Sequence, residues 1–274
     1  MSLSDQEASP GLVRRLKQER RRRVREFGKW MRRWGRHYLE RQSLVGDAPV
    51  LDKSHFPFLD RFTENAQAIR AEVVEILKHR DEIPLFQEIS PDQMRIAKGD
   101  KWRTFILFGF GTKLEKNCRQ APVTASLLEH VPNLQTAWFS ILAPGYHIPR
   151  HKGVTKGILR AHLGLIVPRD AEKCRMRVGH ETCVWREGEI FVFDDTYKHE
   201  VWNETPDERV VLIFDFDRPM RFWGRQFNRL FVWLLKFTAY YQEPKKKIQS
   251  IEDRFEAAVL RANANLEKLG DPDD

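Results

Sequence analysis

The chain has 274 residues, with 47 Lys and Arg against 39 Asp and Glu and a formal net charge of +8 at pH 7. Hydrophobic residues at 41% and charged residues at 31% exclude a disordered chain, and the length fits one large domain with appendages. The three cysteines form no CxxC pair, which excludes a disulfide scaffold and a zinc finger and favours a reducing compartment.

The N-terminal part of the chain carries the charge. Its first residues, MSLSDQEASP, lack the apolar stretch of a secretory signal. Between Leu12 and Arg41, thirteen Lys and Arg stand against three Glu, so this basic arm carries +10 and the rest of the chain −2. Apolar residues recur there every three or four positions, which predicts an amphipathic helix with one apolar face (Val24, Phe27, Met31, Trp34 and Tyr38).

Three environments would suit the basic arm. An anionic membrane surface would use both faces, with aromatic side chains in the interface and arginines at the headgroups. Nucleic acid would use the charge alone, and no nucleic-acid-binding motif accompanies the arm. In the third case the apolar face packs on the protein's own core and the arginines are solvated. The two-faced pattern favours the membrane and disfavours nucleic acid.

The middle of the chain predicts a β-rich domain. The apolar spacing in 61–80 predicts a helix. The segment WRTFILFGFG, which begins at Trp102, predicts a strand that enters a turn, and residues 125–130 predict a short helix. From Gln135 to Arg218, short β-rich runs alternate with turn signals, as in an antiparallel sandwich or a small barrel.

A second amphipathic segment follows the β-rich domain. Phe222 to Tyr241 holds eight aromatic residues in twenty, and its longest apolar run, 230–235, is too short to span a bilayer. Two interpretations stay open, a helix in the membrane interface and a helix packed on the core. Beyond Pro244, a weaker apolar pattern that includes Phe255 and Val259 predicts a last helix.

Polar residues that interrupt the strands are the candidates for chemistry. His151 and His199 lie at predicted strand ends, and two imidazoles suit a divalent iron that must keep open positions. Arg209 leads into an apolar strand, where a guanidinium requires a carboxylate partner. The alternative is that the histidines are hydrogen-bonded core residues, and no tight ligand motif such as HExxH is present. His147 lies on a segment expected to be irregular, as a pocket or a surface residue.

Several of these segments together resemble a known family. TAWFS, HIPRHKG, RAHLGLIVP, VWREGE, FDDTYKHEVWN and ERVVLIFDFDRPM resemble the catalytic domain of the aspartyl/asparaginyl β-hydroxylases, roughly from Trp102 to Met220. The resemblance implies a mainly β fold, a double-stranded β-helix (a cupin-like jelly roll), with flanking N- and C-terminal helices. It also implies Fe(2+), 2-oxoglutarate and O2 as cofactor and cosubstrates of a hydroxylase.

The resemblance assigns roles residue by residue. His151 and His199 match the catalytic iron ligands, and Arg209 matches the arginine that binds the distal carboxylate of 2-oxoglutarate. Further residues of the cosubstrate pocket are matched by Ser140, Arg160 and His162 and, more loosely, by Trp102. Asp195 would either accept a hydrogen bond from a ligand imidazole or cap the turn, and Trp185 reads as a structural residue.

Two positions depart from relatives of the family. Gly153 stands where most of the wider superfamily has a third, carboxylate ligand. The peptidyl hydroxylases also lack this carboxylate, whereas the lipid A hydroxylases usually have an acidic residue at this position. Related halogenases also have a small residue there. Either water or a halide ion is therefore expected to take the position of the missing ligand. Ile158 replaces a cation that helps hold the acidic substrate in the peptidyl enzymes, which favours an apolar substrate.

The sequence therefore predicts three parts: the basic arm in 1–50, the dioxygenase domain in 51–218, and an aromatic helix with a last helix in 219–274. We expect a cytoplasmic enzyme, peripheral on the inner face of the membrane and attached through the arm and the 222–241 helix. The expected reaction is hydroxylation of a membrane-lipid acyl chain, of the lipid A or ornithine-lipid type. The alternatives are β-hydroxylation of aspartyl or asparaginyl residues in a peptide, and a non-catalytic membrane-bound binding module.

Overall fold

The structure is a computed structural model, and it describes residues 34–89, 96–97, 99–109, 111–235, 250 and 252–261. Residues 34–42 and 252–261 are helical. The other helices are η1 (Lys53–His55), η2 (Pro57–Leu59), α2 (Asp60–Glu64), α3 (Ala66–Leu77), η3 (Arg80–Glu82), α4 (Phe86–Ile89), α5 (Glu115–Arg119), α6 (Pro122–Glu129), η5 (Ala171–Lys173) and α7 (Phe222–Leu235). The strands are β1 (Val50–Leu51), β2 (Trp102–Gly109), β3 (Thr112–Lys113), β4 (Leu134–Leu142), β5 (Tyr146–His151), β6 (Ile158–Ile166), β7 (Cys174–Val178), β8 (Glu181–Val184), β9 (Ile190–Phe193), β10 (His199–Asn203) and β11 (Arg209–Asp217).

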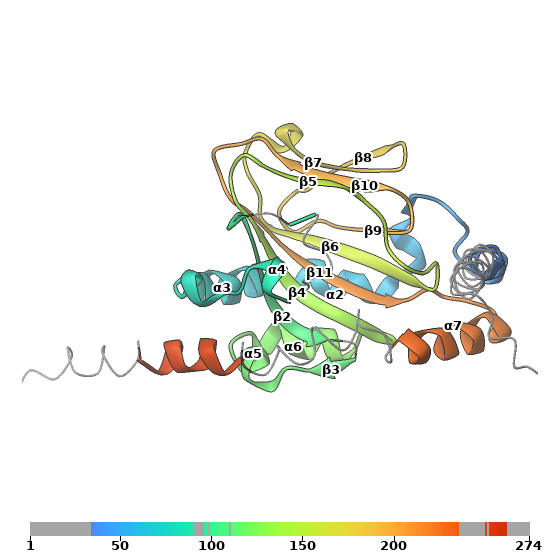
Figure 1. Cartoon of the computed structure of the whole chain (residues 1–274), viewed down its shortest axis with the longest axis horizontal. Coiled ribbons are helices and arrows are strands. Elements are labelled where there is room, and N and C mark those ends of the chain that lie inside the picture. Colours follow the sequence, from blue (N-terminus) through green and yellow to red (C-terminus); the bar gives the residue numbers. More distant parts are fainter. Residues whose placement is uncertain are drawn as a thin grey trace, which may run out of the picture.

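Two antiparallel sheets form the centre of the molecule (Figure 1). The larger sheet has the order β1-β9-β6-β11-β4-β2-β3, and the smaller one has the order β5-β10-β7-β8. From β4 to β11 the chain passes back and forth between the two sheets, which is the winding of a jelly roll. The predicted double-stranded β-helix with flanking helices is therefore confirmed.

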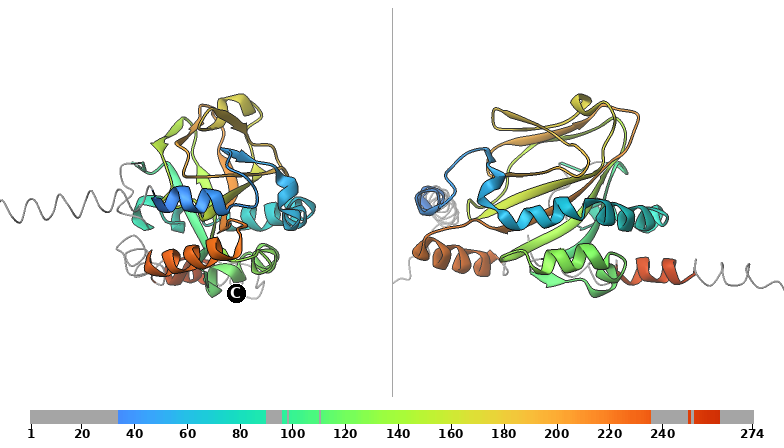
Figure 2. Two further views of the ribbon diagram at one scale, coloured as in Figure 1. Left: turned by 90° about the vertical axis from the view of Figure 1, so that its right-hand side faces the viewer. Right: turned by 180° about the vertical axis from the view of Figure 1, so that it is seen from behind.

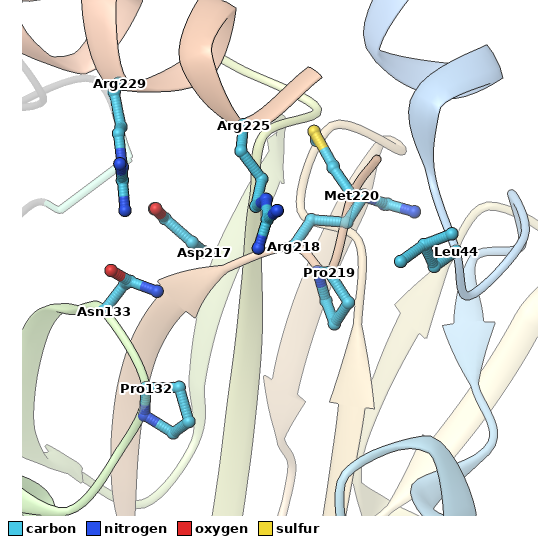
Figure 3. A pocket seen from close by; sticks show the side chains of 9 residues that line it. All are labelled: Leu44, Pro132, Asn133, Asp217, Arg218, Pro219, Met220, Arg225 and Arg229. Carbon is cyan, nitrogen blue, oxygen red and sulfur yellow. The ribbon is translucent and has the colours of Figure 1, made fainter. Parts of the chain in front are cut away.

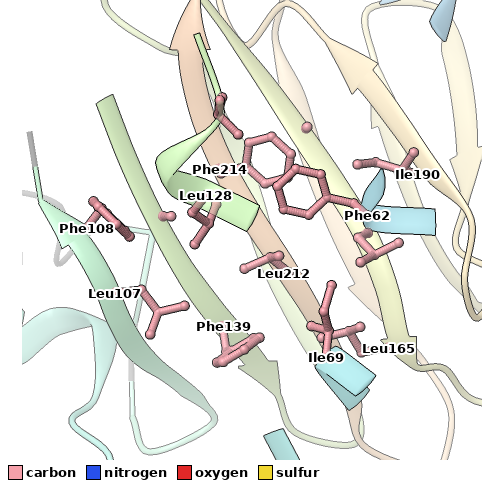
Figure 4. Packing of buried hydrophobic residues seen from close by; sticks show 14 of the residues in the cluster. Phe62, Ile69, Leu107, Phe108, Leu128, Phe139, Leu165, Ile190, Leu212 and Phe214 are labelled. Atoms are coloured by element: carbon pink, nitrogen blue, oxygen red, sulfur yellow. The ribbon is translucent and has the colours of Figure 1, made fainter. Parts of the chain in front are cut away.

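The larger sheet has an apolar face on each side, because successive side chains of a strand point to opposite faces. On β11, Val210, Leu212 and Phe214 belong to the core beneath the helices, whereas Val211 and Ile213 belong to the core inside the barrel. The helices α2, α3 and α6 cover the outer face of the sheet (Figure 2). Figure 4 shows this layer, in which the rings of Phe62 and Phe214 stack with centroids 4.7 Å apart.

The flanking helices pack on each other. Trp34 and Tyr38 contact the ring of Phe227 on α7, at centroid distances of 5.8 and 5.2 Å. At this end of the predicted arm, two residues of the apolar face thus contact a flanking helix, and the three interpretations of the arm stay open. Residues 1–33 and 236–241, which hold the rest of the arm and of the predicted second helix, lie outside the described residues.

Other predictions have mixed outcomes. The helix expected over 61–80 is divided into α2, α3 and η3, with Asn65 as a turn between the first two. His147 was expected on an irregular segment, and this is wrong, because it lies in β5 opposite Trp202 of β10. The three-part division at 50 and 218 stays a prediction. Among the described residues, no helix combines the length and the apolar character that crossing a membrane requires.

Candidate active site

Two histidines from neighbouring strands of the smaller sheet lie side by side. His151 ends β5, His199 begins β10, and the two residues are direct partners in the strand register. Their ring centroids are 4.1 Å apart, with the ring planes tilted by 58°. Strand pairing thus brings together two imidazoles that are 48 positions apart in sequence.

Backbone carbonyls fix which nitrogen each imidazole offers. His151 Nδ1 lies 2.8 Å from the carbonyl oxygen of Pro149, and His199 Nδ1 lies 2.9 Å from that of Tyr197. A carbonyl only accepts, so each Nδ1 carries the proton and each Nε2 keeps its lone pair for a metal. Burial, and then the neighbouring His151, lower the pKa of His199 to about 3, which keeps this imidazole neutral at physiological pH.

Asp195 fills the space beside Gly153. A Cβ on Gly153 would overlap the carboxylate of Asp195, and the amide of Gly153 donates to the backbone carbonyl of Asp195 at 2.6 Å. Burial raises the pKa of Asp195 to about 7, against the opposing charge of Arg160. Of the two roles considered for Asp195, orienting a ligand imidazole is the less favoured one, since backbone carbonyls already accept from both Nδ1 atoms. A carboxylate nevertheless lies where a side chain on residue 153 would stand.

Arg209 is a buried cation whose guanidinium lacks a full set of hydrogen-bond partners among the described residues. It is 1% exposed, and its guanidinium donates to Ser140 Oγ at 3.0 Å. Trp102 Nε1 donates to the same hydroxyl at 3.0 Å, and the guanidinium carbon lies 4.6 Å from the centre of the Trp185 ring. Within the described part of the chain, its Nε has no hydrogen-bond partner and no carboxylate pairs with it. Burial lowers the pKa of Arg209 to about 10, so it stays charged at neutral pH.

His162 adds two more unsatisfied polar atoms to the same interior. Both of its ring nitrogens are buried without a hydrogen-bond partner among the described residues. Burial, followed by the charges of Arg209 and Arg160, holds its pKa well below the ordinary range, so the ring is neutral. A native interior seldom leaves so many polar atoms unpaired, which indicates that a polar ligand completes this site.

The guanidinium of Arg160 is already bound by a carboxylate of the protein. Its Nε and Nη2 donate to the two carboxylate oxygens of Asp215 at 2.7 and 2.8 Å. Nη2 is also 3.7 Å from a carboxylate oxygen of Asp195. Arg160 therefore links Asp215 to the carboxylate beside Gly153, and its expected contact with the cosubstrate stays a prediction.

The residues present fit an iron ion with 2-oxoglutarate. Two imidazoles with oriented lone pairs suit iron, and the guanidinium of Arg209, which pairs with no described carboxylate, suits a carboxylate ligand. Within the described part of the chain, no three His, Cys, Asp or Glu side chains cluster as metal ligands. The protein would thus supply the two imidazoles, and other positions would be open to the cosubstrate and to water.

The structure brings the predicted residues into two groups. Trp102, Ser140 and Arg209 are joined by hydrogen bonds, and His151 and His199 form the imidazole pair. Sequence reasoning missed Asp215, which the cross-strand register places opposite Arg160. It also read Trp185 as structural only, although the ring faces both the guanidinium of Arg209 and the imidazole of His162. A register derived from the strand pattern is the signal that would have found Asp215.

Sequence comparisons relate this chain to known hydroxylases. The family model described as Aspartyl/Asparaginyl beta-hydroxylase matches residues 63–219. A Rhizobium tropici protein, "Ornithine lipid ester-linked acyl 2-hydroxylase", is 39% identical over 82% of this chain and 80% of its own length. The human "Aspartyl/asparaginyl beta-hydroxylase" is also 39% identical, over 47% of this chain but only 17% of its own length.

Solved structures are less similar. A Pseudomonas putida prolyl-4-hydroxylase aligns over 57% of this chain and 88% of its own. The TM-score is 0.35 and the sequence identity is 18%, so the two structures are only distantly alike. The family match and the rhizobial relative, in contrast, each cover more than half of the chain. The resemblance found in the sequence is thereby confirmed: the chain belongs to the aspartyl/asparaginyl β-hydroxylase family and is a hydroxylase.

Proposed function

We propose that the protein is an iron(II)- and 2-oxoglutarate-dependent hydroxylase that acts on an acyl chain of a membrane lipid. The observation that carries the reaction class is Arg209, a buried guanidinium that pairs with no carboxylate among the described residues, in a barrel that also holds an imidazole pair. A dicarboxylate that reaches both groups would satisfy the cation and leave its other end for the metal.

The residues of the chain divide the work of this reaction. Bound iron, 2-oxoglutarate and O2 supply the oxidising chemistry that hydroxylates an unactivated carbon. Arg209, with the Ser140 hydroxyl beside it, orients the cosubstrate, and the carbonyls of Pro149 and Tyr197 hold the two imidazoles in the metal-binding tautomer. The apolar interior around Trp102, Trp185 and Phe193 excludes water from the site.

A lipid substrate is supported by a relative that aligns over most of both chains. The rhizobial relative is named for the hydroxylation of an ester-linked acyl chain of ornithine lipid, and it aligns over 80% of its length. Ile158, at the first position of β6, adds an apolar side chain where a cation would assist an acidic peptide. Both observations favour an acyl chain as the substrate.

A membrane-facing surface is supported by α7. Five large apolar side chains on this helix are at least half exposed: Phe222, Trp223, Leu230, Trp233 and Leu234. Trp223 is 68% exposed and Trp233 is 53% exposed, and such rings are enriched where a protein meets the headgroups of a bilayer. Arg225 and Arg229 lie on the same helix, so cationic and apolar groups are available together. We propose peripheral attachment to the cytoplasmic face through this surface and the basic arm.

The test is succinate release from 2-oxoglutarate and iron(II), measured in parallel with a membrane-lipid extract and with aspartyl peptides. A lipid that stimulates turnover and gains about 16 mass units, one oxygen atom, supports the proposal. His199→Ala, which removes one imidazole, provides the inactive control.

Hydroxylation of aspartyl or asparaginyl residues is the second candidate, favoured by the 39% identity to the human enzyme over 133 residues. Stimulation by the peptides alone would establish it. Failure of the anaerobic protein to bind iron in the presence of 2-oxoglutarate would instead favour the non-catalytic binding module.

A further inference from the structure

A pocket of about 230 Å³ lies between α7 and the end of β11. Asp217 and Asn133 line it on the barrel side, and Arg225 and Arg229 line it on the side of α7. Figure 3 shows both guanidinium groups directed from the helix toward the pocket, with the carboxyl group of Asp217 near Arg229. The described residues thus place charges of both signs around one small space.

The two arginines are available to a ligand. Arg225 and Arg229 are exposed and one helical turn apart, and neither forms an ion pair within the described ranges. Guanidinium groups spaced in this way can bind one carboxylate together. The helix therefore offers a cationic site that the fold itself does not use.

Asp217 offers the opposite charge on the facing wall. Its side chain accepts a hydrogen bond from the amide of Gln135 at 2.9 Å, and it forms no ion pair with a described residue. Burial raises the pKa of Asp217 to about 6, while the nearby charge of Arg229 opposes that shift. The carboxylate is thus ionised at neutral pH, and a cation in the pocket would compensate its burial.

The pocket also lies between the proposed membrane surface and the active site. Asp217 follows Asp215 by two residues on the same face of β11, a separation of about 7 Å along a strand. Asp215 holds Arg160, and Arg160 approaches the carboxylate beside Gly153. On its other side the pocket adjoins α7, whose exposed face carries Trp223 and Trp233. A lipid with its headgroup in the pocket would enter the protein at the level of the bilayer surface.

We propose that this pocket binds the headgroup of the substrate lipid, and that the headgroup is a zwitterionic amino acid. Its carboxylate would bind Arg225 and Arg229, and its ammonium group would bind Asp217. This inference rests on the proposed lipid hydroxylase function and adds to it a site that selects the lipid class.

The charges argue against headgroups whose charges are all of one sign. A phosphate monoester would satisfy the two arginines but would place further negative charge near the carboxylate of Asp217. A purely cationic headgroup would satisfy Asp217 and leave both guanidinium groups unpaired. A headgroup with one carboxylate and one ammonium group satisfies both walls of the pocket at once.

The first test measures binding without iron or 2-oxoglutarate, so that it does not depend on turnover. Three soluble probes are titrated by calorimetry: N-butanoyl-ornithine, N-butanoyl-norvaline, which lacks the ammonium group, and the methyl ester of N-butanoyl-ornithine, which lacks the carboxylate. The wild-type protein should prefer the first probe on the order of 10-fold over each of the others, equivalent to one charged contact.

Variants assign each charge to its wall. In Asp217→Asn, N-butanoyl-ornithine should no longer bind better than the norvaline probe but should still bind better than the ester. In the double variant Arg225→Met with Arg229→Met, N-butanoyl-ornithine should no longer bind better than the ester but should still bind better than the norvaline probe. Arg169→Met, an exposed arginine elsewhere, is the matched control and should leave both preferences unchanged. Equal binding of the three probes to the wild type, or no binding of any, overturns the inference.

A second test separates this inference from the proposed function. Turnover is measured in detergent micelles with ornithine lipid and with the same chain as a headgroup-free methyl ester. The arginine double variant should lose on the order of 10-fold or more in kcat/KM for ornithine lipid alone. An equal loss on both substrates, or none, refutes the headgroup site while leaving lipid hydroxylation intact. Hydroxylation of aspartyl peptides and of neither lipid refutes the proposed function itself.

Discussion

Arg209 and Arg218 are two buried arginines with opposite surroundings. Arg209 begins β11 and Arg218 directly follows its last residue, and they are 1% and 2% exposed. Arg218 is paired at every nitrogen: with Asp194, with the carbonyl oxygens of Lys156 and Gly46, and with Ser43. Among the described residues, the guanidinium of Arg209 donates only to Ser140, and its Nε has no partner.

The difference distinguishes a charge that holds the fold from a charge that awaits a ligand. The cluster around Arg218 also contains Lys156, whose ammonium group pairs with Asp194 at 2.9 Å and with Asp47. It ties the segment before β1, the loop before β6 and the loop before β10 to the end of β11. A complete set of partners indicates a structural role, whereas the incomplete set at Arg209 indicates a binding site.

The largest effect on stability is expected at Arg218. Arg218→Met removes one partner of a buried ion cluster and leaves Asp194 with an incomplete set, so we expect a loss of about 3–5 kcal/mol in the free energy of unfolding. Urea denaturation measures it. The exposed Arg169→Met is the control, and its effect should stay within about 0.5 kcal/mol. Equal effects at the two positions would contradict the structural role of the cluster.

Arg209 should respond in the opposite way. Arg209→Met removes an uncompensated charge, so stability should stay within about 1 kcal/mol of the wild type or increase. The affinity for 2-oxoglutarate should fall by about 3 kcal/mol, on the order of 100-fold, because its distal carboxylate loses its partner. Calorimetry in the presence of Mn(II) measures the affinity. Unchanged affinity for 2-oxoglutarate together with lost stability would show that Arg209, like Arg218, stabilises the fold rather than binds a ligand.

A smaller effect is expected where Gly153 meets Asp195. Gly153→Ala introduces a Cβ into the space of a buried carboxylate, which should cost about 1–3 kcal/mol of stability. Asp195→Ala removes that carboxylate, so the double variant should recover most of the loss. A double-mutant cycle in urea measures the coupling. Additive effects would show that the two residues do not share this space.

The smallest effect is expected at Asp217. Like Arg218 it has a hydrogen-bond partner in the fold, Gln135, but like Arg209 it has no ion-pair partner among the described residues. Its folded pKa of about 6 exceeds the ordinary value of 3.8, so its contribution to stability is complete below about pH 4 and is lost as the pH rises to 6. Relative to the wild type, Asp217→Asn should therefore gain about 1–2 kcal/mol between pH 4 and 7, less than the full shift implies because solvent screens the group. Unfolding at both pH values tests this sign.

The sequence predicted those parts that depend on local pattern. The runs of alternating apolar residues located strands such as β4 and β11, and the motif around His199 located the imidazole pair. Side-chain contacts that depend on strand register and on tertiary packing could not be predicted from the local pattern. Nothing local indicates that Asp215 rather than a ligand holds Arg160, or that Lys156 and Arg218 share Asp194. The amphipathic spacing of Trp34 and Tyr38 likewise fits a membrane and the ring of Phe227 equally well.

The contact between Gly153 and Asp195 also restricts how this site can change by mutation. A carboxylate at position 153 would have to occupy space that the side chain of Asp195 already fills. An acidic residue at 153 would therefore require the side chain of Asp195 to move away or to be replaced, and two carboxylates this close would also repel each other. The step from a two-histidine site to a three-ligand site thus depends on residue 195 as well as on residue 153.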